Sequence, residues 1–157
     1  MRFLQVWAQP TARGLPPRYQ TGFFDDSRKL DKLCQILAPN TTTAGALVSA
    51  AGGSGPAAPS SASTETLSVD SPLRMHASIL RPGARVALEL PAEHRRAYVH
   101  VPIIGRTAGV EVAAPGAQPV RLAPGDGAFI EGAVGSIAFT GLGEAGAETE
   151  LVVMDMP

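Results

Sequence analysis

The sequence lacks the features on which several common classes of protein depend. Cys34 is its one cysteine, so the chain can form neither an internal disulfide nor a cysteine-rich metal site. No apolar run approaches the roughly 18–20 residues that cross a bilayer, which argues against a membrane partner. Thirteen basic residues face 14 acidic ones and form no clustered stripe, so we expect no direct contact with nucleic acid.

The first residues do not have the pattern of a secretory signal. The apolar run from Met1 to Trp7 is interrupted by Gln5 and closed by Gln9 and Pro10, whereas such a signal has a continuous apolar core. We therefore expect an intracellular protein of the cytoplasm, with targeting to an organelle left open. A composition of 45% apolar and 17% charged residues is typical of a folded chain, and 157 residues give room for one domain with a long loop.

Seventeen glycines and 14 prolines divide the chain into short segments. Pairs such as Pro82-Gly83, Pro115-Gly116 and Pro124-Gly125 mark turns. The segments between the turns alternate or are rich in β-branched residues, and none after residue 40 keeps the spacing of an amphipathic helix. The sequence predicts an all-β domain, a sandwich or a small barrel. Its predicted strands cover residues 85–90, 98–101, 109–112, 128–130, 136–140 and 150–154.

One segment near the start is ambiguous. Residues 27–37 place four apolar side chains along one side of a helix, yet Leu33 to Pro39 also reads as an extended strand. The sequence leaves both alternatives open. Cys34 stands in this apolar run, which favours a small buried side chain over a reactive thiol.

The stretch from Asn40 to Thr66 differs in composition from the rest of the chain. It is rich in Thr, Ala, Gly, Ser and Pro, and Glu65 is its one charge. Such a segment buries too little apolar surface to offset the entropy of ordering it, so we predict a flexible loop inserted between two strands. A phosphorylated or partner-binding loop that uses Ser60, Ser61 or Ser63 is the alternative.

Gly141, Gly143 and Gly146 have the glycine spacing of a dinucleotide-binding loop. Such a site also needs a helix N-terminus after the loop and an acidic residue about 20 positions further on. Here 11 residues follow Gly146, and residues 148–153 read as a strand. We therefore predict a glycine-rich hairpin and no nucleotide site.

The histidines His76, His94 and His100 are the candidates for a metal site. A mononuclear site needs several imidazole or carboxylate groups that converge on one point, and Glu93 or Glu131 would be the oxygen ligand. The sequence has no His-x-His pair and no His-x-x-x-His pair. We therefore predict no metal ligands and keep these histidines as weak candidates. No serine stands in a nucleophile-elbow pattern, so we predict no catalytic residues either.

Several motifs follow one another in the order found in a known family. They are Leu4–Pro10, Gly14–Gln20 with Phe23-Phe24, Leu33–Pro39, Arg95–Val101, Leu122–Ala128 and Leu151–Asp155. Their order resembles the pirin family, in its bacterial quercetinase-like branch, over nearly the whole chain outside the insertion. Residues 95–101 match the family's Arg-Arg-Ala-Tyr-Val-His-Val strand, and residues 122–128 match its Leu-x-x-Gly-Asp-Gly-Ala turn.

The resemblance implies a cupin fold, which is a jelly-roll-like antiparallel barrel also called a double-stranded β-helix. Pirin-like proteins have two such domains. Residues 1–24 resemble the segment between the domains, and residues 25–157 resemble the C-terminal domain with an insertion at about 40–66. In the family, the counterpart of Phe3 to Ala8 completes the first cupin. We expect this strand to pack back on the domain, to pair with a metal-cupin chain or a second copy, or to belong to a truncated product.

The resemblance also implies where a metal would lie. The family holds its metal in the first domain, on a His-x-His pair with a later histidine and a glutamate, and this sequence has none of these motifs. Pro124, Gly125 and Asp126 resemble the turn that opens the second cupin motif, after which a ligand histidine is due near Ser136. Ser136 and Ile137 stand there instead. We therefore expect no cofactor.

The residues and the resemblance leave three functions open. The first expectation is a non-catalytic structural or partner-binding module. The alternative, implied by the family's activity, is a flavonol (quercetin) 2,3-dioxygenase with a divergent site, in which His76, His94 and His100 hold a divalent metal (Fe, Ni, Cu or Zn). The third is a binder of small ligands at the barrel mouth, with a lining that includes Tyr98, His100, Phe129 and Phe139.

Overall fold

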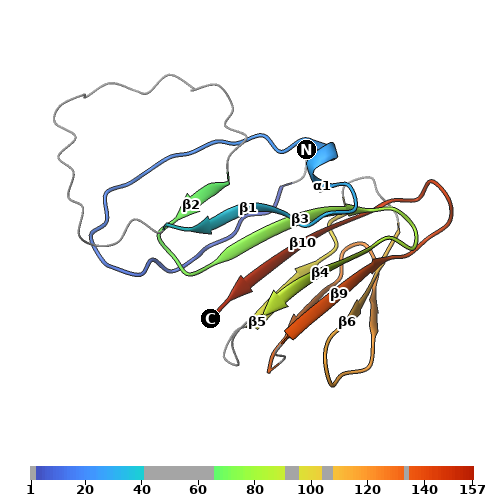
Figure 1. Ribbon diagram of the computed structural model, residues 1–157. Helices are drawn as coiled ribbons and strands as arrows, with labels where there is room; N and C mark the ends of the chain where they lie inside the picture. The colour runs from blue at the N-terminus through green and yellow to red at the C-terminus, as the bar shows by residue number, and fades with distance from the viewer. Residues whose placement is uncertain (1–2, 41–65, 91–95, 104–107, 133–134) are drawn as a thin grey trace.

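The computed structural model describes residues 3–40, 66–90, 96–103, 108–132 and 135–157. Within these ranges, ten strands form two sheets, and a single helical turn, α1 (Asp26–Lys29), precedes the first strand (Figure 1). No helix in the described part of the chain is long and apolar enough to cross a membrane.

The larger sheet has six strands and the smaller sheet has four. The order in the larger sheet is β2 (Leu67–Val69), β1 (Cys34–Pro39), β3 (Arg74–Leu80), β10 (Thr149–Met156), β5 (Arg96–His100) and β8 (Gly127–Ile130). The order in the smaller sheet is β4 (Arg85–Leu90), β9 (Gly135–Gly141), β6 (Val110–Ala113) and β7 (Val120–Leu122). The pairing of β1 with β2 is parallel, and the other strand pairs described are antiparallel.

Alternation along the strands places apolar side chains between the two sheets. In β4, Val86, Leu88 and Leu90 are buried while the residues between them are exposed, as in a strand with one solvated face. Phe139 and Ile137 of β9 lie opposite Val86 and Leu88 in the ladder. With inward side chains of β5, β6 and β10, they form one continuous core.

The predicted all-β fold is confirmed, and all six predicted strands are found. Residues 85–90 coincide with β4, and the ends of the other five differ by one or two residues from those of β5, β6, β8, β9 and β10. Three further strands have no counterpart among these six ranges: β3, a seven-residue strand that includes His76, and β2 and β7, which are three residues long. Strands as short as β2 and β7 show too little alternation to be recognised from sequence.

The ambiguous segment takes the second of its two alternatives, a turn that runs into a strand, and the helix over residues 27–37 does not form. The turn is α1, and the Asp25 carboxylate caps it by accepting a hydrogen bond from the Arg28 backbone N–H at 3.2 Å. After the turn, Asp31 has a positive φ of 51°, and its carboxylate accepts the backbone N–H of Arg81 at 3.0 Å. The strand then begins at Cys34, which is buried as predicted.

The loop with Gly141, Gly143 and Gly146 is not the hairpin that the sequence predicts. A strand does follow it, since β10 begins at Thr149. However, β9 pairs with β4 and β6, whereas β10 pairs with β3 and β5, so the loop crosses from the smaller sheet to the larger one. Gly143 and Gly146 have φ values of 117° and 88°, which allow this change of direction.

The predicted insertion lies, apart from its end residues, outside the described residues. Both end residues are bound at the edge of the larger sheet. Asn40 Nδ2 donates to the Asp70 carboxylate at 2.9 Å, and Thr66 Oγ1 donates to the Gln35 carbonyl at 3.1 Å. The chain therefore leaves and re-enters the described structure beside β1 and β2.

Residues 3–8, called the apolar segment below, lie outside both sheets. They belong to no strand or bridge, and all of them are exposed. Of the arrangements expected for this segment, packing back on the domain as a strand is not found. Further along, the Thr11 backbone N–H donates to the Asp70 carbonyl at 2.8 Å, which holds the chain at the β2 edge of the larger sheet.

Candidate functional site

The space between the two sheets is filled with apolar side chains. Phe139 and Ile137 of the smaller sheet and Val99 and Leu151 of the larger sheet have no exposed surface. They belong to one cluster of buried residues that reaches across both sheets. A ligand held inside the barrel would have to displace this core.

The turn at Pro124, Gly125 and Asp126 has the geometry that its sequence predicts. Gly125 has a φ of 100°, which favours glycine. The Asp126 carboxylate accepts a hydrogen bond from the Ala123 backbone N–H at 2.9 Å and closes the turn. The turn therefore keeps its cupin-like form without contributing a metal ligand.

The position where the resemblance places a ligand histidine holds no imidazole. Ser136 is exposed and lies opposite Glu89 in the ladder, on the outer face of the smaller sheet. Ile137 points inward, lies opposite Leu88 and is fully buried. The barrel interior therefore receives an aliphatic side chain at this point.

His76 and His100 point to opposite faces of the larger sheet. Cross-strand partners share a face, and neighbours along one strand point to opposite faces. His100 pairs with Val152 of β10, and Val152 pairs with Ala77, the neighbour of His76 in β3. His76 instead pairs with Val153, on the inner face. Because the sheet separates them, these two candidate ligands do not converge on one metal ion.

The remaining candidate ligands do not complete a site among the described residues. His94 and Glu93 lie outside the described residues. Glu131 is exposed, and its Oε1 lies 3.6 Å from Arg96 Nη1. In the part of the chain that the structure describes, no three His, Cys, Asp or Glu side chains are grouped so as to hold a metal ion.

His76 lies near an ion pair between the half-exposed Arg74 and the buried Asp155 on the inner face. Asp155 is 2% exposed, and its Oδ2 lies 3.1 Å from Arg74 Nη1. Burial lowers the pKa of His76 below its ordinary value of 6.5, while the charge of Asp155 raises the pKa and that of Arg74 lowers it. Nδ1 of His76 is buried and has no hydrogen-bond partner among the described residues. The neutral imidazole is therefore the favoured form in the folded chain.

The predicted lining of a barrel cavity is divided between two sides of the larger sheet. Val99 points into the core, so its neighbours Tyr98 and His100 point outward. Phe129 pairs with Tyr98 and is also outside, with ring centroids 4.7 Å apart. Phe139 lies in the core. The condition for a shared cavity, that the strands turn all four side chains inward, is met by Phe139 and not by Tyr98, His100 or Phe129.

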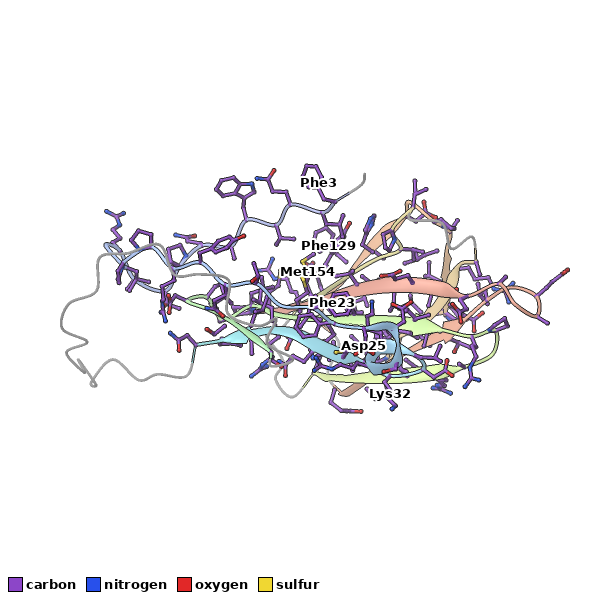
Figure 2. All side chains as sticks on the ribbon, turned by 90° about the horizontal axis from the view of Figure 1, so that it is seen from above. Phe3, Phe23, Asp25, Lys32, Phe129 and Met154 are labelled. Atoms are coloured by element: carbon purple, nitrogen blue, oxygen red, sulfur yellow. The ribbon has the colours of Figure 1, made fainter. Side chains whose placement is uncertain are left out.

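The outward aromatic side chains form an apolar strip on the larger sheet. Tyr98 lies parallel to His100, with ring centroids 6.4 Å apart. It pairs across the strands with Phe129 on one side and Met154 on the other, two residues that are labelled in Figure 2. A Cβ on Gly127 would lie 2.3 Å from Tyr98 Oη, so glycine leaves room for this ring against the sheet.

A small cavity of ≈ 200 Å³ with a mainly apolar lining opens beside β8, and Gln118 and Glu131 are its polar lining residues. Phe129 and Val120 form part of its wall and are 68% and 52% exposed. Because its walls come from the turn between β6 and β7 and from β8, sequence reasoning did not predict it. The apolar lining residues are Val112, Ala114, Pro115, Ala117, Val120, Ala128, Phe129 and Ile130.

A second cavity of ≈ 330 Å³ lies at the β2 edge, and its polar groups bind one another. Arg18 Nη2 lies 2.6 Å and 2.8 Å from the two carboxylate oxygens of Asp70. Hydrogen bonds from Asn40 and then Arg18 lower the pKa of Asp70 below its ordinary value of 3.8. Gln20 also binds Ser68, and its Nε2 donates a hydrogen bond to Ser68 Oγ at 3.0 Å. We interpret these contacts as a tether for residues 11–20.

Comparisons with known proteins support the fold. No family model and no curated protein matches the sequence. Among solved structures, the chain is similar to YhhW from Escherichia coli with 18% identity and a TM-score of 0.57, covering 94% of this chain and 47% of YhhW. It also matches the Cupin_2 domain of an XRE family transcriptional regulator from Enterobacter cloacae, with 19% identity over 54% of this chain and 81% of that chain and a TM-score of 0.42.

A de novo designed double-stranded β-helix matches 52% of this chain and 97% of its own length, with 17% identity and a TM-score of 0.41. The fold is thus all-β and of the cupin type, as the resemblance implied. The chain spans about half the length of YhhW.

Proposed function

We propose that this chain is a non-catalytic, partner-binding module with a cupin fold, of the kind found as the C-terminal domain of pirin-like quercetinases. The observation that carries the proposal is the filled barrel interior. Phe139 and Ile137 are fully buried there, and the position expected for a ligand histidine contributes the aliphatic side chain of Ile137.

The chemistry of a flavonol dioxygenase explains why a filled interior argues for this function. Such a reaction needs a divalent metal with an open coordination position, held by convergent imidazole and carboxylate groups. The described interior is mainly apolar, and its polar groups, such as His76 and Asp155, are not part of any group of three ligand side chains. His76 and His100 lie on opposite faces of the larger sheet, so the described residues do not fit a metal in the barrel.

The partner-binding part of the proposal is supported by the apolar segment. Phe3 and Trp7 are 79% and 87% exposed, although large aromatic side chains gain most from burial. The proposed partner is a metal-cupin chain or a second copy of this chain. The proposed role is to stabilise that partner and not to perform chemistry.

Metal content and oxygen uptake test the proposed function directly. The purified chain is dialysed extensively, analysed for Fe, Ni, Cu and Zn, and then supplied with each metal and with quercetin in an oxygen electrode. We expect a metal-to-chain ratio near zero and no flavonol-dependent oxygen uptake. One tightly bound metal per chain together with flavonol-dependent uptake would overturn the proposal.

The variants His76→Ala and His100→Ala give matched controls for the same measurements. Because the two side chains point to opposite faces, neither variant is expected to change the metal content of the chain. Should the unaltered chain contain bound metal, its loss in both variants would show that the two histidines belong to one site.

A further inference from the structure

The apolar segment has the pattern of a strand that is covered on both faces. Phe3 and Trp7 would share one face of such a strand, and Leu4 and Val6 the other. Strands that are buried on both faces read as nearly continuous apolar runs. Here the exposed fractions are 79% and 87% on the first face and 50% and 40% on the second. Figure 2 shows Phe3 pointing away from the two sheets.

The backbone of the apolar segment is also without strand partners among the described residues. Residues 3–8 make no ladder contact and no backbone hydrogen bond within the described structure. An unpaired, apolar, extended backbone is a template for pairing with the edge of another sheet.

The edge of β8 has the features of a surface that receives a strand. In the described part of the chain, β8 pairs with β5 alone, so its other side is an open edge of the larger sheet. Phe129 of this edge and Val120 of β7 in the smaller sheet are each more than half exposed. The ≈ 200 Å³ apolar cavity opens between them.

We propose that the apolar segment of one copy of this chain adds as a strand to the β8 edge of a second copy, and that the second copy does the same in return. Backbone hydrogen bonds hold the added strand, and the indole of Trp7 fills the apolar cavity against Phe129. This inference rests on the proposed partner-binding function and identifies the partner as a second copy.

The short stretch between Thr11 and the apolar segment favours binding to the partner's β8 over the chain's own. Thr11 is held at Asp70, beside β2, and β2 and β8 are the two opposite edges of the larger sheet. Five strand spacings separate these edges, which is about 24 Å across the sheet. The three residues from Ala8 to Thr11 span only about 10 Å. While this contact holds, the short reach of the segment favours the β8 edge of a second copy over its own.

The area that two such contacts bury is sufficient for a stable dimer. Phe3 and Trp7 each offer about 150–250 Å², so one segment buries roughly 300–500 Å² through these two side chains. Two segments and the matching surface that they cover give about 1,200–2,000 Å², which is the size of a standard specific interface. A reciprocal contact is also closed, so it ends at a dimer.

Sedimentation velocity and light scattering of the full 157-residue chain, from about 1 to 200 µM, measure the dimer directly. We expect a dimer whose dissociation constant rises at least about tenfold in Trp7→Ala and in Phe129→Ser. Tyr19→Ala is the matched control, since Tyr19 is 90% exposed but lies outside the apolar segment, and its dimer is expected to be unchanged. Circular dichroism verifies that each variant is folded.

A mixture of the two variants tests the pairing of segment with edge. The mixed dimer has one Trp7→Ala chain and one Phe129→Ser chain. At one contact Trp7 still meets Phe129, and at the other the two substituted side chains would meet. Because contacting residues are not additive, we expect its dissociation constant to lie below the geometric mean of the two homodimer values. A value at the mean would overturn the proposed contact.

The proposal is also overturned by a chain that stays monomeric throughout the concentration range, or by a dimer that Trp7→Ala leaves unchanged. Either result leaves the metal and oxygen measurements as they stand, so the failure of this inference is distinguishable from the failure of the proposed function. A monomer that binds a metal-cupin chain instead would identify the other expected partner.

Discussion

Phe139 and Phe129 carry the same side chain in opposite surroundings. Phe139 has no exposed surface and lies in the core, whereas Phe129 is 68% exposed and contacts Tyr98 on the outer face. We expect Phe139→Ala to lower the free energy of unfolding by about 3–5 kcal/mol. Phe129→Ala is the matched control and should cost about 1 kcal/mol or less. Urea unfolding, at a chain concentration too low for dimers to form, measures the free energy of unfolding of both variants. Equal losses in the two variants would contradict the faces assigned to the two side chains.

His76 makes the stability of the fold depend on pH. Burial lowers the pKa of this imidazole in the folded chain below 6.5, so the unfolded chain binds more protons as the pH falls through that value. Stability is therefore expected to decrease from pH 7 toward pH 5. In His76→Gln this part of the decrease should be absent. Urea unfolding at several pH values gives the difference, and a slope unchanged in the variant would contradict the assignment.

At the scale of elements, Gln20 protects the edge strand β2. The Ser68 backbone N–H donates to Gln20 Oε1 at 3.1 Å, and Gln20 Nε2 donates to the Ser68 carbonyl at 3.3 Å. The side-chain amide thus occupies hydrogen-bonding groups of an edge strand that would otherwise be open.

Hydrogen exchange of the Ser68 amide tests this protection. In Gln20→Ala the exchange rate is expected to rise about 3–10-fold, the equivalent of one net hydrogen bond. Gln20→Glu is the matched control, because a carboxylate still accepts the Ser68 N–H and should keep most of the protection. If the exchange rate in Gln20→Ala equalled that of the unaltered chain, backbone contacts would be sufficient to protect the Ser68 amide without the Gln20 side chain.

At the scale of the whole molecule, the two edges of the larger sheet differ in how they are covered. The β2 edge is bound by residues 11–20 of the same chain through Thr11, Arg18 and Gln20. The β8 edge lies beside exposed apolar side chains and an apolar cavity. Together with the filled interior, this asymmetry supports the proposed contact with a partner at the β8 edge.

Most of the strands were predictable because each depends on a local pattern. Alternation in residues 85–90 and the turn at Gly125 are properties of a few neighbouring residues, and the structure reproduces both. The position of the candidate histidines was less predictable. Alternation fixes which residues of one strand share a face, but only the pairing of β3, β10 and β5 shows that His76 and His100 point to opposite faces.

The sequence by itself determined the all-β fold, six of its strands and the buried Cys34, since hydrophobic period and turn chemistry act over a few residues. Tertiary structure alone decided that β9 and β10 join different sheets, so that the loop from Gly141 to Gly146 is a crossing and not a hairpin. It also decided that Phe139 is inside while Tyr98 and Phe129 are outside. The reason is the same in each case: strand pairing joins residues far apart in the chain, and no local pattern specifies its partner or its register.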